Sequence, residues 1–216
     1  MNFMRQMGIL PPMNMNVSVG LIGAGGIGAA TAIALAKMGI KWLEVYDFDT
    51  IEDVNIPNQL LRVSDIGKPK VASLMSLIKQ LSDTQGVMHR TKIEANTSLD
   101  FQHIYITTVD SIEARKEIWE NIQANVRCNW YLDARMGAEL FQLYTIDMTN
   151  HAWYARNLAD LTDDNVPDEP CTAKATIYTA FFAAGHIAHA VKRILMNEEQ
   201  PKLLQHDIKN MSLIIP

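Results

Sequence analysis

The stretch VSVGLIGAGGIGAATAIALAKMGIKWLEVYDFD, residues 17–49, decides how this chain folds. It begins with an apolar run typical of a buried strand and turns at a cluster of glycines. An alanine-rich run to Met38 then predicts a helix, and a second strand begins at Trp42. This order predicts one strand–helix–strand unit of a parallel sheet.

The glycines of the turn have the spacing Gly-x-Gly-x-x-Gly, which is typical of nucleotide-binding turns. We expect Gly23 to permit the sharp turn, Gly25 to let a phosphate approach, and Gly28 to let helix and sheet pack closely. Free N–H groups from Gly26 onward would face the anion. Asp47 lies 19 residues after Gly28, where such units place an acid that binds a ribose hydroxyl. The alternative is a glycine turn that serves only close packing. It would account for Gly28, but not for Gly23 and Gly25 together with Asp47.

The start of the chain carries no charge between Arg5 and Lys37, so it also resembles a signal peptide or a membrane span. The Pro-Pro pair at residues 11–12 and five glycines within residues 20–28 argue against a helix in lipid. We therefore expect no targeting segment and no membrane partner. Arg5 is the only charge in residues 1–16, where a solvated tail arginine is the simplest interpretation.

Composition favours one globular domain over residues 1–216, with a flexible segment at 1–16 and a tail at 197–216. The net charge of −5 argues against nucleic acid as a partner. Neither Cys128 nor Cys171 belongs to a close pair, so we expect no zinc site. Two cysteines in 216 residues suit a reducing cytoplasm.

A polar loop follows the second strand, beyond Asp49. Ligands of open parallel sheets bind outside the carboxyl ends of the strands, so we expect this loop to face a nucleotide. Its candidate contacts are amides and one cation: Asn55, Asn58, Gln59 and Arg62. The alternative is a surface turn in which Asn and Pro only set the backbone.

A helix is predicted from Gly67-Lys-Pro-Lys70 to Leu81, with its apolar residues at helical spacing. Lys70 lies in its first turn, where a cation gains nothing from the helix dipole. A phosphate would explain the lysine, and a solvated lysine remains the alternative.

The run from His103 to Asp110 predicts a buried strand that also ends in an acid, with Ser111 capping the helix that follows. Acids at neighbouring strand ends suit a ribose and a magnesium ion, so Asp110 is a candidate Mg²⁺ ligand. Helix capping by Asp110 is the alternative.

Further elements are expected along the rest of the chain. The pattern predicts strands at residues 86–94, 130–134, 137–148 (at an edge of the sheet) and 213–215, and helices at 113–125, 151–158 and 170–196. Cys171 would lie at the start of the last helix, where N–H groups favour a thiolate. Alternatively, Cys171 packs as a small, buried apolar side chain.

Taken in order, these residues resemble the ThiF/MoeB/HesA family, the bacterial relatives of ubiquitin-activating enzymes. The resemblance covers roughly residues 17–195. It rests on Gly23-Ala-Gly-Gly-Ile-Gly28, Asp47-Phe-Asp49-Thr-Ile, Asn55, Gln59, Gly67-Lys-Pro-Lys70, Val109-Asp110-Ser111 and Cys171. It implies a Rossmann-like, mostly parallel sheet with helices on both faces and an antiparallel extension.

The resemblance also implies an activity: ATP- and Mg²⁺-dependent adenylation of the C-terminal Gly-Gly of a ubiquitin-like or sulfur-carrier protein. Asp47 would then hold the ribose, with Asp49 beside it. Asn55, Gln59 and Lys70 would line the phosphates, and Asp110 would position the metal.

Two more residues gain a role only from the resemblance. Arg5-Gln6 resembles an N-terminal Arg-Gln whose arginine reaches the partner subunit's site, which implies a homodimer. Cys171 matches a position that carries the transferred group in some members of the family.

This chain departs from the family at Asn58, where an arginine is usual, and Arg62 is the nearest substitute. Two other functions therefore stay open. A nucleotide- or partner-binding module that has lost adenylation would fit the missing arginine. An NAD-dependent oxidoreductase would explain the glycine turn and Asp47, but not Lys70 with Asp110.

Overall fold

An eight-stranded sheet runs through the computed structural model, which describes residues 1–124, 128–162 and 176–216. Its strands lie in the order β3-β2-β1-β4-β5-β6-β7-β8. The strands are β1 (Ser18–Ile22), β2 (Trp42–Tyr46), β3 (Gln85–His89), β4 (Ile104–Thr107), β5 (Trp130–Gly137), β6 (Leu140–Asp147), β7 (Leu203–Asp207) and β8 (Ser212–Ile214). The strands β1 to β5 pair in parallel, and β6 to β8 add antiparallel pairs. The predicted Rossmann-like sheet with an antiparallel extension is confirmed.

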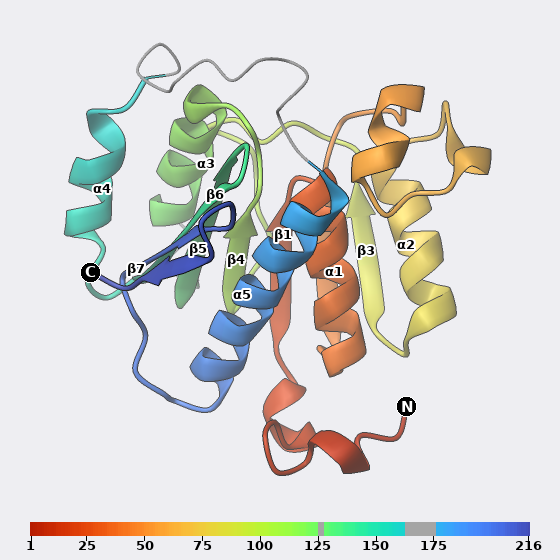
Figure 1. Cartoon of the computed structure of the whole chain (residues 1–216), viewed down its shortest axis with the longest axis horizontal. Helices are drawn as coiled ribbons and strands as arrows, with labels where there is room; N and C mark the ends of the chain where they lie inside the picture. The colour runs from red at the N-terminus through yellow and green to blue at the C-terminus, as the bar shows by residue number, and fades with distance from the viewer. Residues whose placement is uncertain (125–127, 163–175) are drawn as a thin grey trace.

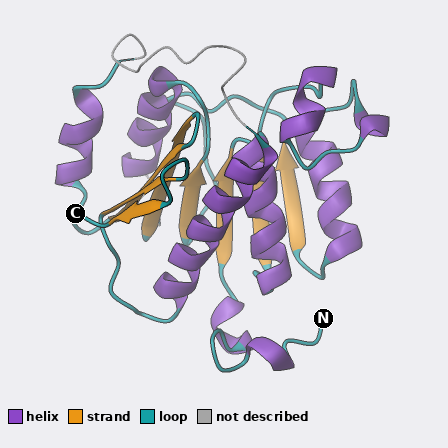
Figure 2. Cartoon of the chain, in the orientation of Figure 1, coloured by secondary structure: helices purple, strands orange, loops and turns teal. Residues whose placement is uncertain are grey.

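Helices cover both faces of this sheet (Figure 1). They are α1 (Gly26–Met38), α2 (Lys70–Leu81), α3 (Ile112–Ala124), α4 (Ala152–Ala159) and α5 (Ile177–Leu195). One apolar core joins α1, α2 and α5 to one face, and a second core joins α3 and α4 to the other. Successive side chains of β1 point to opposite faces of the sheet, so Leu21 lies in the first core and Ile22 in the second. Figure 2 shows the sheet between the two helical layers.

The unit predicted from residues 17–49 forms as β1, α1 and β2. Gly39 ends α1 in a left-handed conformation, with φ of 101°, so the chain can return directly to β2. β1 pairs with β2 on one side and with β4 on the other. The chain therefore reverses its winding direction at β1, and open parallel sheets bind ligands outside the strand ends at such a reversal.

Three differences from the predicted elements concern strand positions. β3 ends at His89 rather than residue 94, because the chain then turns away, with Thr97 Oγ1 accepting from Glu94 N–H at 2.8 Å. β6 lies between β5 and β7, so its predicted place at an edge is wrong. β7 was not predicted, whereas a strand near residue 213 is confirmed as β8.

The N-terminal segment lies at the end of the sheet opposite the carboxyl ends of the parallel strands (Figure 1). It forms two 3-10 turns, Met4–Gln6 and Pro12–Met15. Gln6 Nε2 donates to Met38 O at 2.7 Å, and Asn14 Nδ2 donates to Leu195 O at 2.9 Å. In the described part of the chain, no helix has both the length and the apolar character that crossing a membrane requires.

Candidate nucleotide-binding site

The glycine turn leaves β1 with its backbone in a conformation that glycine favours. Gly23 has φ of 99°, and its N–H donates to Tyr46 O at 2.8 Å. A Cβ added at Gly28 would lie 2.0 Å from Gly23 O, so α1 packs against the turn only because this side chain is absent. A Cβ added at Gly25 meets nothing within 4 Å, so Gly25 faces open space.

The N-terminus of α1 opens into this space. The first helical hydrogen bond runs from Ala29 N–H to Gly25 O at 2.8 Å, so the N–H groups of Gly26, Ile27 and Gly28 have no helical acceptor. No side chain caps the helix. Such N–H groups, aligned with the helix dipole, can bind an anion.

Asp47 joins the glycine turn to the end of β2. Its Oδ2 accepts from Ala24 N–H at 2.6 Å, and its Oδ1 accepts from Asp49 N–H at 2.8 Å. Each oxygen keeps a further lone pair, which is enough to accept a ribose hydroxyl.

Lys70 lies at the first position of α2, only 8% exposed, and pairs with Asp49. Its Nζ donates to Asp49 Oδ2 at 2.7 Å, and its backbone N–H donates to Asp49 O at 3.0 Å. The sequence pattern gave no sign of this carboxylate partner for Lys70. Asp49 remains 44% exposed, so an incoming ligand can reach the pair.

The pair lines a polar pocket of about 360 Å³. Its lining residues are Phe48, Asp49, Thr50, Glu52, Asn55 and Lys70. Asn55 is fixed there by its Oδ1, which accepts from Glu52 N–H at 2.9 Å. Phe48, Thr50 and Glu52 were not singled out from the sequence, although their place directly after β2 was a signal.

Next along the loop, the backbone of Asn58 lies against the N-terminus of α1. Asn58 O is 2.7 Å from the position of a Cβ added at Gly26. Among the described residues, the buried Asn58 Oδ1 and Gln59 Oε1 have no hydrogen-bond partner. Arg62 is not brought to these amides, because its Nη2 donates to Gln80 Oε1 on the last turn of α2 at 2.8 Å.

Asp110 lies exposed in the loop that follows β4. Thr108 N–H donates to Ile22 O at 2.9 Å, and Thr108 Oγ1 donates to Gly23 O at 3.0 Å. Ser111 Oγ accepts from Ala114 N–H at 3.2 Å, which confirms its predicted role as a helix cap. The loop that carries Asp110 and the turn that carries Gly23 are therefore in direct contact.

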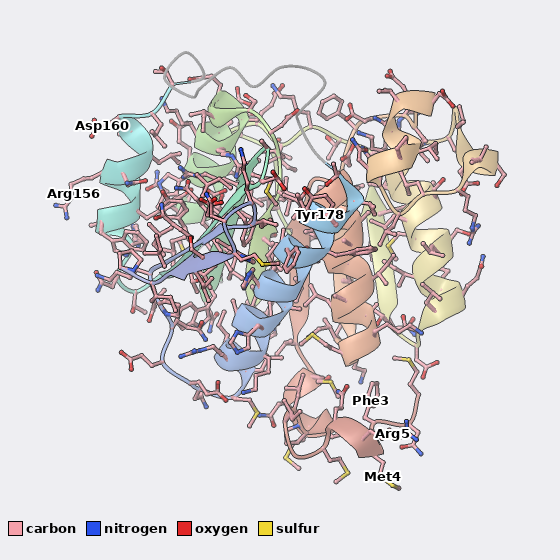
Figure 3. The ribbon with its side chains drawn as sticks, viewed as in Figure 1. Phe3, Met4, Arg5, Arg156, Asp160 and Tyr178 are labelled. Atoms are coloured by element: carbon pink, nitrogen blue, oxygen red, sulfur yellow. The ribbon has the colours of Figure 1, made fainter. Side chains whose placement is uncertain are left out.

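One candidate catalytic residue, Arg5, is not part of this cluster. Arg5 is exposed at the far end of the sheet, opposite Tyr178 at the start of α5 (Figure 3). Cys171 lies outside the described residues.

The arrangement belongs to the Rossmann-like class of α/β proteins: a glycine turn, a helix N-terminus and an acid at the next strand end meet at the reversal of strand order. More narrowly, the chain belongs to the ThiF family, whose profile matches residues 14–215.

Named relatives match about half of the chain. Over 107 residues it is 38% identical to the NEDD8-activating enzyme E1 catalytic subunit of Arabidopsis thaliana, covering 47% of this chain and 23% of that protein. Over 98 residues it is 33% identical to the adenylyltransferase and sulfurtransferase MOCS3 of Aedes aegypti, covering 44% and 22%. The chain thus spans about a quarter of the length of these relatives.

Solved structures share the fold over nearly the whole chain. The structure of E. coli MccB with ATP superposes with a TM-score of 0.73 at 18% identity, covering 95% of this chain and 65% of that one. PaaA superposes with a TM-score of 0.70 at 17% identity, covering 94% and 73%.

Proposed function

We propose that this chain uses ATP to adenylate the C-terminal carboxylate of a small ubiquitin-like or sulfur-carrier protein ending in Gly-Gly. The observation that carries the proposal is the meeting of three loops at the carboxyl end of β1. Thr108 bonds to the glycine turn, Asp47 bonds to Ala24, and Lys70 bonds to Asp49. The relatives named for NEDD8 activation and for adenylyl and sulfur transfer support the choice of substrate class.

In this reaction a carboxylate oxygen attacks the α-phosphorus of ATP. The bond from that phosphorus to its bridging oxygen breaks, and pyrophosphate leaves with the electron pair. The N–H groups of Gly26, Ile27 and Gly28 would bind phosphate oxygens, and Asp47 would accept from the ribose. Lys70 would stabilise negative charge on the leaving group.

Asp110 fits a magnesium site because it is an exposed carboxylate on the loop that Thr108 bonds to the glycine turn. Mg²⁺ usually takes one or two protein carboxylates together with substrate phosphates and water. When bound, Mg²⁺ neutralises charge that develops on the phosphates. Asp110 would contribute by holding one carboxylate oxygen toward that position.

The arginine usual for the family is replaced by Asn58, whose amide is a neutral group. A second cation would then have to come from elsewhere. Arg5 lies exposed at the end of the sheet opposite the site of its own chain, so we infer that it acts in the site of a partner subunit within a homodimer. Cys171 would receive the activated acyl group in a later step: its thiolate attacks the acyl carbon, and AMP leaves.

Pyrophosphate exchange into ATP tests the proposal directly. We expect exchange only with a carrier that ends in Gly-Gly, and a loss of about a hundredfold in Lys70→Gln and in Asp110→Asn. Lys68→Gln is the matched control, because Lys68 lies two residues away and pairs with Asp65 instead.

The other outcomes separate the alternatives. ATP binding without exchange in the wild type would identify a binding module that has lost adenylation, as Asn58 favours. Tight NAD binding without exchange would identify an oxidoreductase. Equal losses in Lys68→Gln and Lys70→Gln would remove the specific role given to Lys70.

A further inference from the structure

Asp133, in the middle of β5, has no exposed surface and accepts from three side chains. Its Oδ1 accepts from Arg115 Nη1, and its Oδ2 accepts from Arg135 Nε at 2.7 Å and from Tyr154 OH at 2.8 Å. In the described chain both arginines form their ion pairs with this one carboxylate. The cluster of Arg115, Asp133, Arg135 and Tyr154 therefore carries one positive charge without a counterion.

The two arginines are not equivalent. Arg115 is buried, and its Nη2 donates to Val109 O and to Ala134 O in addition to the bond to Asp133. Arg135 is 12% exposed, and its Nη2 reaches only Tyr154 OH, at 3.4 Å. No described residue accepts a hydrogen bond from Arg135 Nη1. Arg135 is thus the member of the cluster that can bind something more.

Aromatic rings hold this guanidinium in place. It lies 4.3 Å from the ring centroid of Tyr144 and 5.9 Å from that of Tyr154. These rings restrict the side chain and keep water from most of its surface. A charged hydrogen bond formed there is stronger than one formed in open water.

Strand register places Arg135 beyond the carboxyl end of β4, at the edge of the sheet where the candidate nucleotide site lies. Asp133 pairs with Thr107 at the end of β4, and Arg135 lies two residues further along β5, on the same face. Arg115 joins Asp133 to Val109 O, directly before Asp110. Arg135 is therefore linked through one shared carboxylate and one guanidinium to the loop that carries Asp110.

We propose that Arg135 binds the C-terminal carboxylate of the substrate protein. The inference rests on the proposed adenylation and adds the residue that receives the acyl substrate. A single carboxylate supplies the one negative charge that the cluster lacks, and the planar guanidinium matches its geometry. With one oxygen held by Arg135, the other is free to attack. A triphosphate has several negative charges, and its proposed place is at the N-terminus of α1.

The test compares two forms of a short N-acetylated peptide ending in Gly-Gly, one with a free acid and one with a C-terminal amide. Binding to the full chain with a non-hydrolysable ATP analogue is measured by calorimetry, and the Arg Nε–Hε signals are followed by NMR. We expect the wild type to bind the acid about tenfold more tightly than the amide, with a shift of the Arg135 signal. In Arg135→Gln the two forms should bind equally.

Two variants complete the design. Arg156→Gln removes an exposed arginine from α4 and should keep the preference for the acid. Arg135→Lys keeps the positive charge and should restore part of the preference for the acid. The NMR shift is measured on the wild type, so it does not depend on whether a variant folds. A wild type without acid preference, or an Arg135→Gln variant that keeps it, overturns the inference. Pyrophosphate exchange is scored separately, so its absence refutes adenylation whatever the peptides show.

Discussion

Gly25→Ala is the substitution that best separates folding from ligand binding in this chain. In the free protein the added Cβ meets no atom within 4 Å, and the backbone at Gly25, with φ of −72° and ψ of −156°, is extended. We therefore expect the free energy of unfolding to change by less than about 0.5 kcal/mol. The same methyl group would stand where a phosphate approaches the N–H groups of α1. Loss of one hydrogen bond to a charged group costs about 1.5–3 kcal/mol, or roughly a tenfold to hundredfold loss of ATP affinity.

Thermal unfolding and calorimetric titration with ATP measure the two effects. Gly185→Ala is the matched control, since its Cβ also meets nothing within 4 Å but lies inside α5. It should stabilise the fold by up to about 1 kcal/mol, through helix propensity, and leave ATP affinity unchanged. A Gly25→Ala variant that binds ATP like the wild type would refute the placing of a phosphate at this turn.

Two further predictions concern stability. Gly28→Ala should lower the free energy of unfolding by about 3 kcal/mol and the melting temperature by roughly 6–12 °C, because its Cβ would lie 2.0 Å from Gly23 O. A normal melting temperature would show that the turn adapts. Burial, and then the charges of His206 and His189, lower the pKa of His186 below 6.5. The folded protein then binds fewer protons than the unfolded chain, so stability present above pH 6.5 is lost as the pH falls. Melting curves from pH 7.5 to 5 should show a smaller loss for His186→Gln, and equal losses would contradict the assignment.

Local patterns were sufficient to predict the parallel half of the sheet. Residues 17–49 carry their own strand, turn and helix signals, and Ser111 caps α3 as its position indicated. β7 could not be predicted in the same way. Its sequence, Leu-Leu-Gln-His-Asp, has little alternation, and it becomes a strand because β6 offers a free edge. That pairing also moves β6 away from the edge of the sheet.

In the candidate site, too, some features follow from the local sequence and others only from the tertiary structure. Asp47 and Lys70 were identified from their place after a strand and before a helix, but their protein partners depend on how loops meet in three dimensions. Arg115 and Asp133 were not singled out at all. The signal available was a charged residue inside the apolar run Tyr131–Ala134, which a buried strand tolerates only with a partner.

The contact between Lys70 and Asp49 has a consequence for which anions this pocket admits. The ammonium group already has a negative neighbour in the resting protein, so an arriving ligand must displace that carboxylate or share the cation with it. Weakly held ions such as chloride or sulfate gain little from such an exchange. A nucleotide anchored at several points can outcompete the resident group, so Asp49 would act as a built-in competitor that raises selectivity at the expense of affinity.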